Sequence, residues 1–275
     1  MSLDLLPSLR DRLALSTGTG RLEDAFAFAD ELGIRWLELA CQEPANQPHT
    51  FDRARVDGVR RLMRSTGIRG VVHTASSVNV AEIVPGVREA VEGYLRQYVE
   101  LAHNLEVSTV IVHAGFQFDL DVPERISALQ TTLGRCAEVA GRLGVTLAIE
   151  NMNVLPAAAE ITYLGCTPDE IGDILDAVDS PSLTACLDLG HAHLLPDGVG
   201  RFLDRVGGRI GHVQLTDNDG VVDDHLALGE GTIDVSAALT GLARVGYEGP
   251  VAIELASRAD QLASLAHLGW ETSGR

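Results

Sequence analysis

Short apolar runs alternate with longer amphipathic runs along the whole chain, and this alternation limits the fold more than any other feature. Most of the short runs are apolar on both faces, as in strands that helices cover on both sides of a parallel sheet. Their length suits strands, and that of the amphipathic runs suits helices. Eight strands are predicted, at residues 13–18, 35–40, 69–74, 108–114, 145–150, 183–188, 209–215 and 250–255.

Eight helices are predicted between and after these strands, and several of them carry start and stop signals. Thr167 is followed by a proline and two acids, which is typical of an N-cap with proline at the first helical position. Glycines stand where C-caps are expected, at Gly33, Gly67 and Gly144. The helices are expected at residues 21–33, 52–67, 86–106, 123–144, 168–178, 199–207 and 233–246, and from about 259 onward.

Eight strand–helix units in 275 residues match a closed (β/α)₈ barrel, so we predict an α/β fold with one domain over residues 1–275. A doubly wound open sheet would more often have fewer strands and a glycine-rich phosphate loop after the first. The turn at residues 17–20 is too weak a match to a dinucleotide-binding fingerprint. An NAD cofactor is therefore not expected.

The charge balance excludes several classes of function. With 21 basic and 39 acidic residues, the net charge of −18 repels nucleic-acid backbones and anionic membranes. All the basic residues are arginines, and the chain contains no lysine. Schiff-base aldolases and pyridoxal-phosphate enzymes need a catalytic lysine, so both are excluded. We expect a small-molecule substrate and no nucleic-acid partner.

The cysteines and the N-terminal residues indicate the compartment. Four scattered cysteines without CxxC spacing favour a reduced, cytoplasmic protein. The N-terminal segment lacks the basic and apolar parts of a signal peptide, and no apolar run is long enough to span a membrane. We therefore expect a cytoplasmic protein without a membrane partner.

Oxygen ligands end four consecutive strands and should converge at one mouth of a barrel. They are Glu150, Asp188, Gln214 and Glu254. Three carboxylates close together repel one another unless they are protonated or share a cation. An all-oxygen set favours Mg²⁺ or Mn²⁺, with Co²⁺ or Zn²⁺ as less favoured ions. The alternative is four separate polar caps, each hydrogen-bonded to a neighbouring loop.

Histidines gather at the same predicted mouth. His73 and His113 end strands, His191 follows Asp188 by three residues, and Asp223 and His225 lie in the loop after the seventh strand. As a group they are expected to bind substrate hydroxyls, or else to form a second metal site. The histidines assigned a structural role instead are His49, His103, His193 and His212.

Three other features near the mouth are candidates for binding. Glu38 ends the second strand and is expected either to contact the substrate or to support a residue that does. Arg258 is the basic residue just beyond the eighth strand and is assigned to substrate binding. The turn at residues 229–231 carries backbone N–H groups that could hold an oxygen anion, although nearby aspartates make it a poor phosphate site.

These motifs resemble the xylose isomerase-like TIM-barrel superfamily, over nearly the whole chain. That group includes sugar and sugar-phosphate isomerases and epimerases, hydroxypyruvate isomerase, inosose dehydratase and the AP endonucleases of family 2. The resemblance implies the same four metal ligands, with Glu150 and Glu254 also acting as acid and base and His191 contacting a substrate oxygen. The segments that carry it are HTASSVN, VIVHAG, LAIEN, CLDLGHAH, HVQLTDND, HLALGEG and VAIEL.

The implied activity is metal-dependent isomerisation or epimerisation of a sugar or small α-hydroxy carbonyl compound. A glutamate would remove a carbon-bound proton, giving a cis-enediolate, and the other would return it. The chain departs from the endonucleases and many epimerases at Gln214, where they have histidine. Glutamine there is similar to the hydroxypyruvate isomerase branch and weakens the case for a zinc cluster.

Three alternatives stay open at this point. An inosose dehydratase-like lyase would use the same base and metal to expel a β-hydroxyl group. An AP endonuclease-type phosphodiesterase is disfavoured by the net charge, the absence of lysine and Gln214. A non-catalytic barrel that binds a polyol or a protein is the third. We expect a homodimer or a homotetramer.

Overall fold

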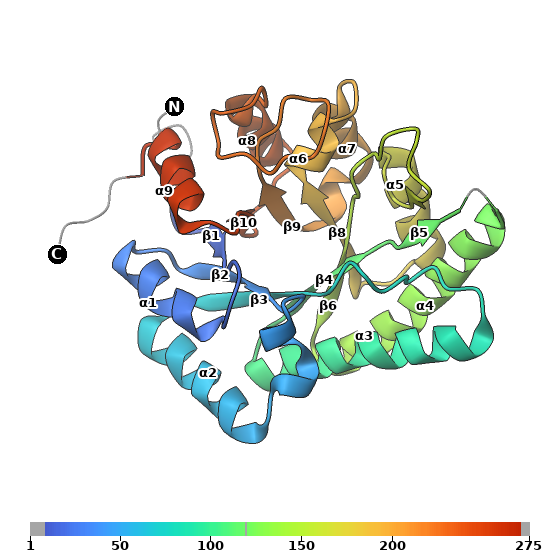
Figure 1. Ribbon diagram of the computed structural model, residues 1–275, viewed down its shortest axis with the longest axis horizontal. Helices are drawn as coiled ribbons and strands as arrows, with labels where there is room; N and C mark the ends of the chain where they lie inside the picture. The colour runs from blue at the N-terminus through green and yellow to red at the C-terminus, as the bar shows by residue number, and fades with distance from the viewer. Residues whose placement is uncertain (1–8, 119, 271–275) are drawn as a thin grey trace.

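The computed structural model describes residues 9–118 and 120–270; the other residues of the predicted domain, 1–8, Asp119 and 271–275, lie outside the described part. Eight parallel strands close into a barrel in the order β1-β10-β9-β8-β6-β4-β3-β2. Figure 1 shows the long helices arranged around the outside of these strands. The prediction of a (β/α)₈ barrel is therefore confirmed.

The barrel strands coincide with the eight predicted runs to within two residues at each end. They are β1 (Leu13–Ser16), β2 (Trp36–Ala40), β3 (Arg69–His73), β4 (Thr109–His113), β6 (Thr146–Glu150), β8 (Leu183–Asp188), β9 (Ile210–Leu215) and β10 (Val251–Ile253). The helices that follow them are α1 (Glu23–Glu31), α2 (Arg53–Thr66), α3 (Pro85–Leu105), α4 (Val122–Arg142), α5 (Pro168–Val178), α7 (Gly198–Val206), α8 (Val235–Arg244) and α9 (Arg258–His267).

The predicted caps account for two helix ends. Thr167 caps α5 in a capping box, in which its side chain accepts from the backbone N–H of Glu170 and the Glu170 side chain accepts from that of Thr167. Gly67 ends α2 in the left-handed conformation, at a φ of 70°. A residue with a Cβ atom adopts this conformation at a cost, so glycine is favoured there.

The barrel interior has an apolar layer beneath a polar one. Val71, Ile111, Ala148 and Cys186 form a small buried cluster of their own, separate from the main core. Side chains two residues apart on a strand share a face, so the next inward positions are those of His73, His113, Glu150 and Asp188. The apolar layer closes the barrel from below, and the polar layer lies at the C-terminal mouth.

The main hydrophobic core lies between the strands and the surrounding helices. Phe26, Tyr98 and Phe202 are its largest fully buried side chains. Burying a side chain of this kind contributes roughly 1.5–3 kcal/mol. This core holds the strands in a fixed register, which is what brings their polar ends together.

Several short elements were not predicted from the sequence. Strands β5 (Phe116–Gln117) and β7 (Thr162–Tyr163) pair as a separate antiparallel sheet that joins the loops after β4 and β6. Helix α6 (Leu189–His193) directly follows β8. The single-turn helices are η3 (Pro44–Asn46), η4 (Pro48–Thr50) and η5 (Gly207–Arg209). Within the described ranges, no helix is both long and apolar enough to cross a bilayer.

Candidate active site

Three carboxylate oxygens at the mouth of the barrel are buried and have no hydrogen-bond partner. They are Oε2 of Glu150, Oδ2 of Asp188 and Oε2 of Glu254. An ionised carboxylate in such a position is costly unless a proton or a cation compensates it. Ligand atoms of Glu150 and Asp188 lie within 4.8 Å of each other and of His191, and those of Glu254 lie equally close to Glu38 and His73. A divalent cation with oxygen ligands would compensate such carboxylates.

Asp188 is held in place on every side except the one that faces this mouth. Its Oδ1 accepts from the backbone N–H of His191 at 2.6 Å, because Asp188 is the N-cap of α6. The side-chain amide of Asn151 bonds both the backbone N–H and the carbonyl of Asp188, at 2.7 and 3.0 Å. Only Oδ2 remains free for a further partner.

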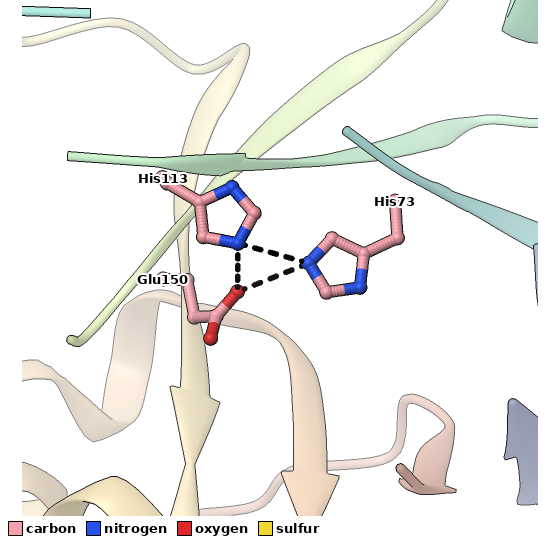
Figure 2. A group of neighbouring side chains, drawn as sticks. All are labelled: His73, His113 and Glu150. Atoms are coloured by element: carbon pink, nitrogen blue, oxygen red, sulfur yellow. Dashed lines mark hydrogen bonds and ion pairs between the residues drawn. The ribbon is translucent and has the colours of Figure 1, made fainter. Parts of the chain in front are cut away.

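Two histidines and a glutamate present three ligand atoms to one point (Figure 2). His73 Nε2 lies 3.2 Å from His113 Nε2, and both nitrogens lie 3.3 Å from Glu150 Oε2. Neutral imidazole nitrogens and carboxylate oxygens would repel one another at these distances through their lone pairs. A shared proton or a metal ion resolves the repulsion, and this group fits a metal such as Zn²⁺ or Mn²⁺.

The carboxylates at the mouth differ in how far neighbouring histidines offset the cost of burying their negative charge. Burial raises the pKa of Glu254 well above its usual range, and the nearby carboxylate of Glu38 adds to the rise. Burial also raises the pKa of Asp188, although His191 opposes it. Burial acts in the same direction on Glu150, but His113 and His73 outweigh it and lower its pKa to about 2. Asp188 and Glu254 thus lack a positive neighbour strong enough to offset their burial.

A second group, on the loop after β9, faces α6. Asp223 Oδ2 lies 3.1 Å from His191 Nε2 and 3.3 Å from His225 Nε2. The other oxygen of Asp223 is buried without a partner. His225 has a φ of 47°, a conformation that non-glycine residues rarely adopt and that occurs more often at functional sites. This group offers a further set of metal ligands.

The loop that carries Asp223 and His225 is fixed by a buried carboxylate. Asp217 accepts from the backbone N–H groups of Asn218, Gly229 and Ile233, at 2.9, 2.8 and 3.0 Å. The turn at residues 229–231 was expected to offer such groups to an oxygen anion. The anion that takes the Gly229 N–H is the protein's own Asp217, so this donor is not left for a ligand.

Glu38 and Gln214 contact each other rather than the unpartnered oxygens. Glu38 is fully buried and accepts from His73, His212 and Gln214. The Gln214 amide nitrogen donates to Glu38, and its amide oxygen accepts from the thiol of Cys186 at 3.0 Å. Gln214 therefore has no unpartnered atom to offer a metal, in contrast to the other three predicted ligands.

Arg258 lies at the start of α9, beside α1. Its guanidinium donates to the carbonyl of Asp24 at 2.9 Å and lies over the ring of Phe28. It lines a cavity of about 260 Å³ that also includes Thr17 and Thr19. A larger hollow of about 1060 Å³ lies between α7 and α8, where His193 is bonded to Thr232. Neither hollow is lined by the carboxylates or histidines of the mouth.

Three contacts of the site were missed from the sequence. His212 was assigned a structural role, and it is fully buried with its Nε2 2.8 Å from Glu38, a partner that was not foreseen. Cys186 precedes Asp188 by two residues, so the spacing of the strand could have placed it on the same face. No sequence pattern indicates the hydrogen bonds of Asn151 to the Asp188 backbone, because they depend on how the loop after β6 turns.

Known proteins resemble the chain over most of its length. A family model described as xylose isomerase-like TIM barrel matches residues 26–270. The uncharacterized protein MJ1311 of Methanocaldococcus jannaschii is 33% identical over 190 residues, which span 67% of this chain and 63% of that relative. Fructoselysine 3-epimerase of Shigella flexneri is 22% identical, over 85% of each chain. A solved D-tagatose 3-epimerase-like protein is 26% identical, covers 94% of this chain and 96% of its own, and superposes with a TM-score of 0.83.

Proposed function

The chain belongs to the xylose isomerase-like TIM-barrel family, and we propose that it is a divalent-metal-dependent sugar epimerase or isomerase. The observation that carries this proposal is that one buried oxygen of each of Glu150, Asp188 and Glu254 at the mouth of the barrel has no hydrogen-bond partner, although that of Glu150 lies 3.3 Å from two histidine nitrogens. Two relatives support the same activity, since one is a fructoselysine 3-epimerase and the other a D-tagatose 3-epimerase-like protein.

Glu150, Asp188 and Glu254 would hold the metal, and a bound divalent cation would polarise the substrate carbonyl. The cation is proposed to be Mn²⁺ or Mg²⁺, because the set consists of carboxylates. Gln214, the fourth ligand expected from the sequence, is not included because both ends of its amide group are engaged.

Glu150 and Glu254 are proposed as the catalytic acid and base. Glu150 ends β6 and Glu254 directly follows β10, and each lies near a different nitrogen of the His73 ring. Glu150 Oε2 lies 3.3 Å from Nε2 of this ring, and Glu254 Oε1 lies 3.4 Å from Nδ1. One carboxylate, ionised, would remove the proton next to the carbonyl, and the other, already protonated, would deliver its own proton to the same carbon from the opposite face or to the neighbouring carbon.

His113, His191 and His225 line the same mouth and are proposed to bind substrate hydroxyl groups. His191 is anchored through Nδ1, 2.8 Å from the carbonyl of Asn151. His225 is the more exposed of the three, with 38% of its side chain accessible. A sugar entering the mouth would therefore meet His225 before it reaches the buried carboxylates.

The proposal can be tested with ketoses in deuterated water. The protein, loaded with Mn²⁺, is incubated with D-tagatose, D-psicose, L-ribulose or fructoselysine, and the product is analysed by mass and NMR. Epimerisation or isomerisation with uptake of solvent deuterium at carbon is expected, and it should be lost in Glu150→Gln and Glu254→Gln. Full activity in both folded, metal-loaded variants would refute the assigned roles. A product lighter by one water would instead indicate a lyase.

A second candidate function rests on the histidine groups. His73–His113–Glu150 and His191–Asp223–His225 both offer nitrogen ligands, which suit zinc better than an all-oxygen set does. Several zinc ions per chain would favour a phosphodiesterase of the AP endonuclease type. Nicking of an abasic DNA duplex by the zinc-loaded protein is the test, and the net charge of −18 counts against this activity.

A further inference from the structure

The buried carboxylate of Glu38 is the acceptor of three side chains at once. Its Oε1 lies 3.0 Å from His73 Nδ1 and 3.2 Å from Gln214 Nε2, and its Oε2 lies 2.8 Å from His212 Nε2. The side chain is fully buried, so a substrate at the mouth cannot reach it without displacing these partners. Its role must therefore act through its neighbours.

The orientation of Gln214 follows from chemistry. The atom of its amide that faces Glu38 must be a donor, because an amide oxygen would repel a carboxylate at this distance. The amide oxygen then faces Cys186, whose thiol donates to it at 3.0 Å. Gln214 and His212 together hold Glu38 with both of its oxygens occupied.

The direction of the Glu38 carboxylate decides which nitrogen of His73 carries a proton. Nδ1 lies 3.0 Å from Glu38 Oε1 and 3.4 Å from Glu254 Oε1, and the Gln214 amide nitrogen lies farther away at 3.5 Å. The shortest contact is to a carboxylate, which can only accept, so Nδ1 is the donor. Nε2 faces His113 and Glu150 at the point where three ligand atoms meet (Figure 2). A histidine that binds a metal through one nitrogen commonly donates its other N–H to a carboxylate, and this partner fixes the ring and its tautomer.

We propose that Glu38 is a positioning residue, which keeps the proton of His73 on Nδ1 and so presents the lone pair of Nε2 to a metal between His73, His113 and Glu150. Gln214 and His212 serve this arrangement by orienting Glu38. This metal would lie beside the one proposed at Glu150, Asp188 and Glu254, with Glu150 common to both, and His113 would then be a ligand rather than a contact to substrate. The inference rests on the proposed function in one respect, because both require that the chain bind a divalent metal at the mouth.

Two substitutions of Glu38 separate positioning from simple structural support. Glu38→Leu removes the acceptor, whereas Glu38→Gln retains one oxygen for His73. In the glutamine variant the new NH₂ group would face His212, whose Nδ1 is buried without a partner and can take the proton from Nε2. We therefore expect His212 to change tautomer in Glu38→Gln while His73 keeps its own.

The affinity for Zn²⁺, used alone as a diamagnetic probe, is measured by competition with a chelating indicator. Loss of a carboxylate that orients a ligating histidine typically costs 10–100-fold in metal affinity, which is the expected effect of Glu38→Leu. Glu38→Gln should retain most of the affinity. The matched control is Glu92→Gln, which alters another buried carboxylate, paired with Arg135 and distant in the fold; its affinity should equal that of the unaltered chain.

The tautomers are read from ¹⁵N spectra of histidine-labelled, zinc-loaded protein, with signals assigned by replacing one histidine at a time. The unaltered chain should show His73 protonated at Nδ1 and unprotonated at Nε2. The opposite tautomer would overturn the proposal even if Glu38→Leu does not fold. Equal Zn²⁺ affinity in folded Glu38→Leu would also overturn it and leave the proposed function intact, whereas failure of the unaltered chain to bind Zn²⁺ or Mn²⁺ would overturn both.

Discussion

Substituting Asp217 by asparagine should destabilise the loop after β9 and, with it, the whole chain. The carboxylate is 1% exposed and accepts three backbone N–H bonds, from Asn218, Gly229 and Ile233. Asparagine retains the oxygen that serves two of these donors but turns an NH₂ group toward Gly229, so that this bond is lost. Because a hydrogen bond to a charged group contributes roughly 1.5–3 kcal/mol and the other two bonds also weaken, we expect a loss of about 2–4 kcal/mol.

The free energy of unfolding is measured by urea denaturation of both proteins, and hydrogen exchange is followed at the amides of Gly229 and Ile233. Exchange at both amides should become faster in Asp217→Asn. The control is Asp219→Asn in the same loop, since Asp219 is exposed and accepts one bond, from Val221 at 3.0 Å; it should change stability by less than about 0.5 kcal/mol. An equally small change for Asp217→Asn would refute the reasoning.

Three further predictions concern stability and reactivity. Thr167→Ala should lower the free energy of unfolding by about 1 kcal/mol in a urea titration, because it removes the capping box of α5, and no change would contradict the assigned cap. Removing metal with a chelator should lower the melting temperature, and adding Mn²⁺ at about 100 times its dissociation constant should raise the free energy of unfolding by roughly 2.7 kcal/mol. A melting temperature that changes neither with the chelator nor with Mn²⁺ would argue against a metal bound to the native state. Burial raises the pKa of all four thiols, to about 12 in three of them; they are Cys41, Cys136, Cys166 and Cys186. Ellman's reagent should therefore react with them only after unfolding, and rapid reaction of the native protein would contradict their burial.

Much of the fold follows from local sequence patterns. The strands of the barrel could be predicted because each is a short run of apolar residues followed by a helical stretch, several of which have their own caps. The alternation of side chains along a strand also accounts for the two interior layers, since Ile111 and Ala148 precede His113 and Glu150 by two residues. Strand β5, with two residues, is too short for any periodicity to indicate it.

The candidate site is less accessible to such reasoning. Closure of the barrel explains why Glu150 and Asp188 end at the same mouth. Which atoms of Gln214 face which neighbours depends on Glu38, 176 positions away in the sequence, and on the thiol of Cys186. Contacts of this kind are set by the closed barrel as a whole, and no local spacing encodes them.

The central claim, a divalent metal held at the mouth of the barrel, is tested most directly by elemental analysis of the purified protein after loading with Mn²⁺ or Zn²⁺. Glu150→Gln removes a charge shared by two of the ligand groups, and Glu92→Gln removes a buried carboxylate elsewhere. At least one ion per chain is predicted for the unaltered protein and for Glu92→Gln, and much less for Glu150→Gln. No bound metal in any of the three, or equal amounts in all, would contradict the account.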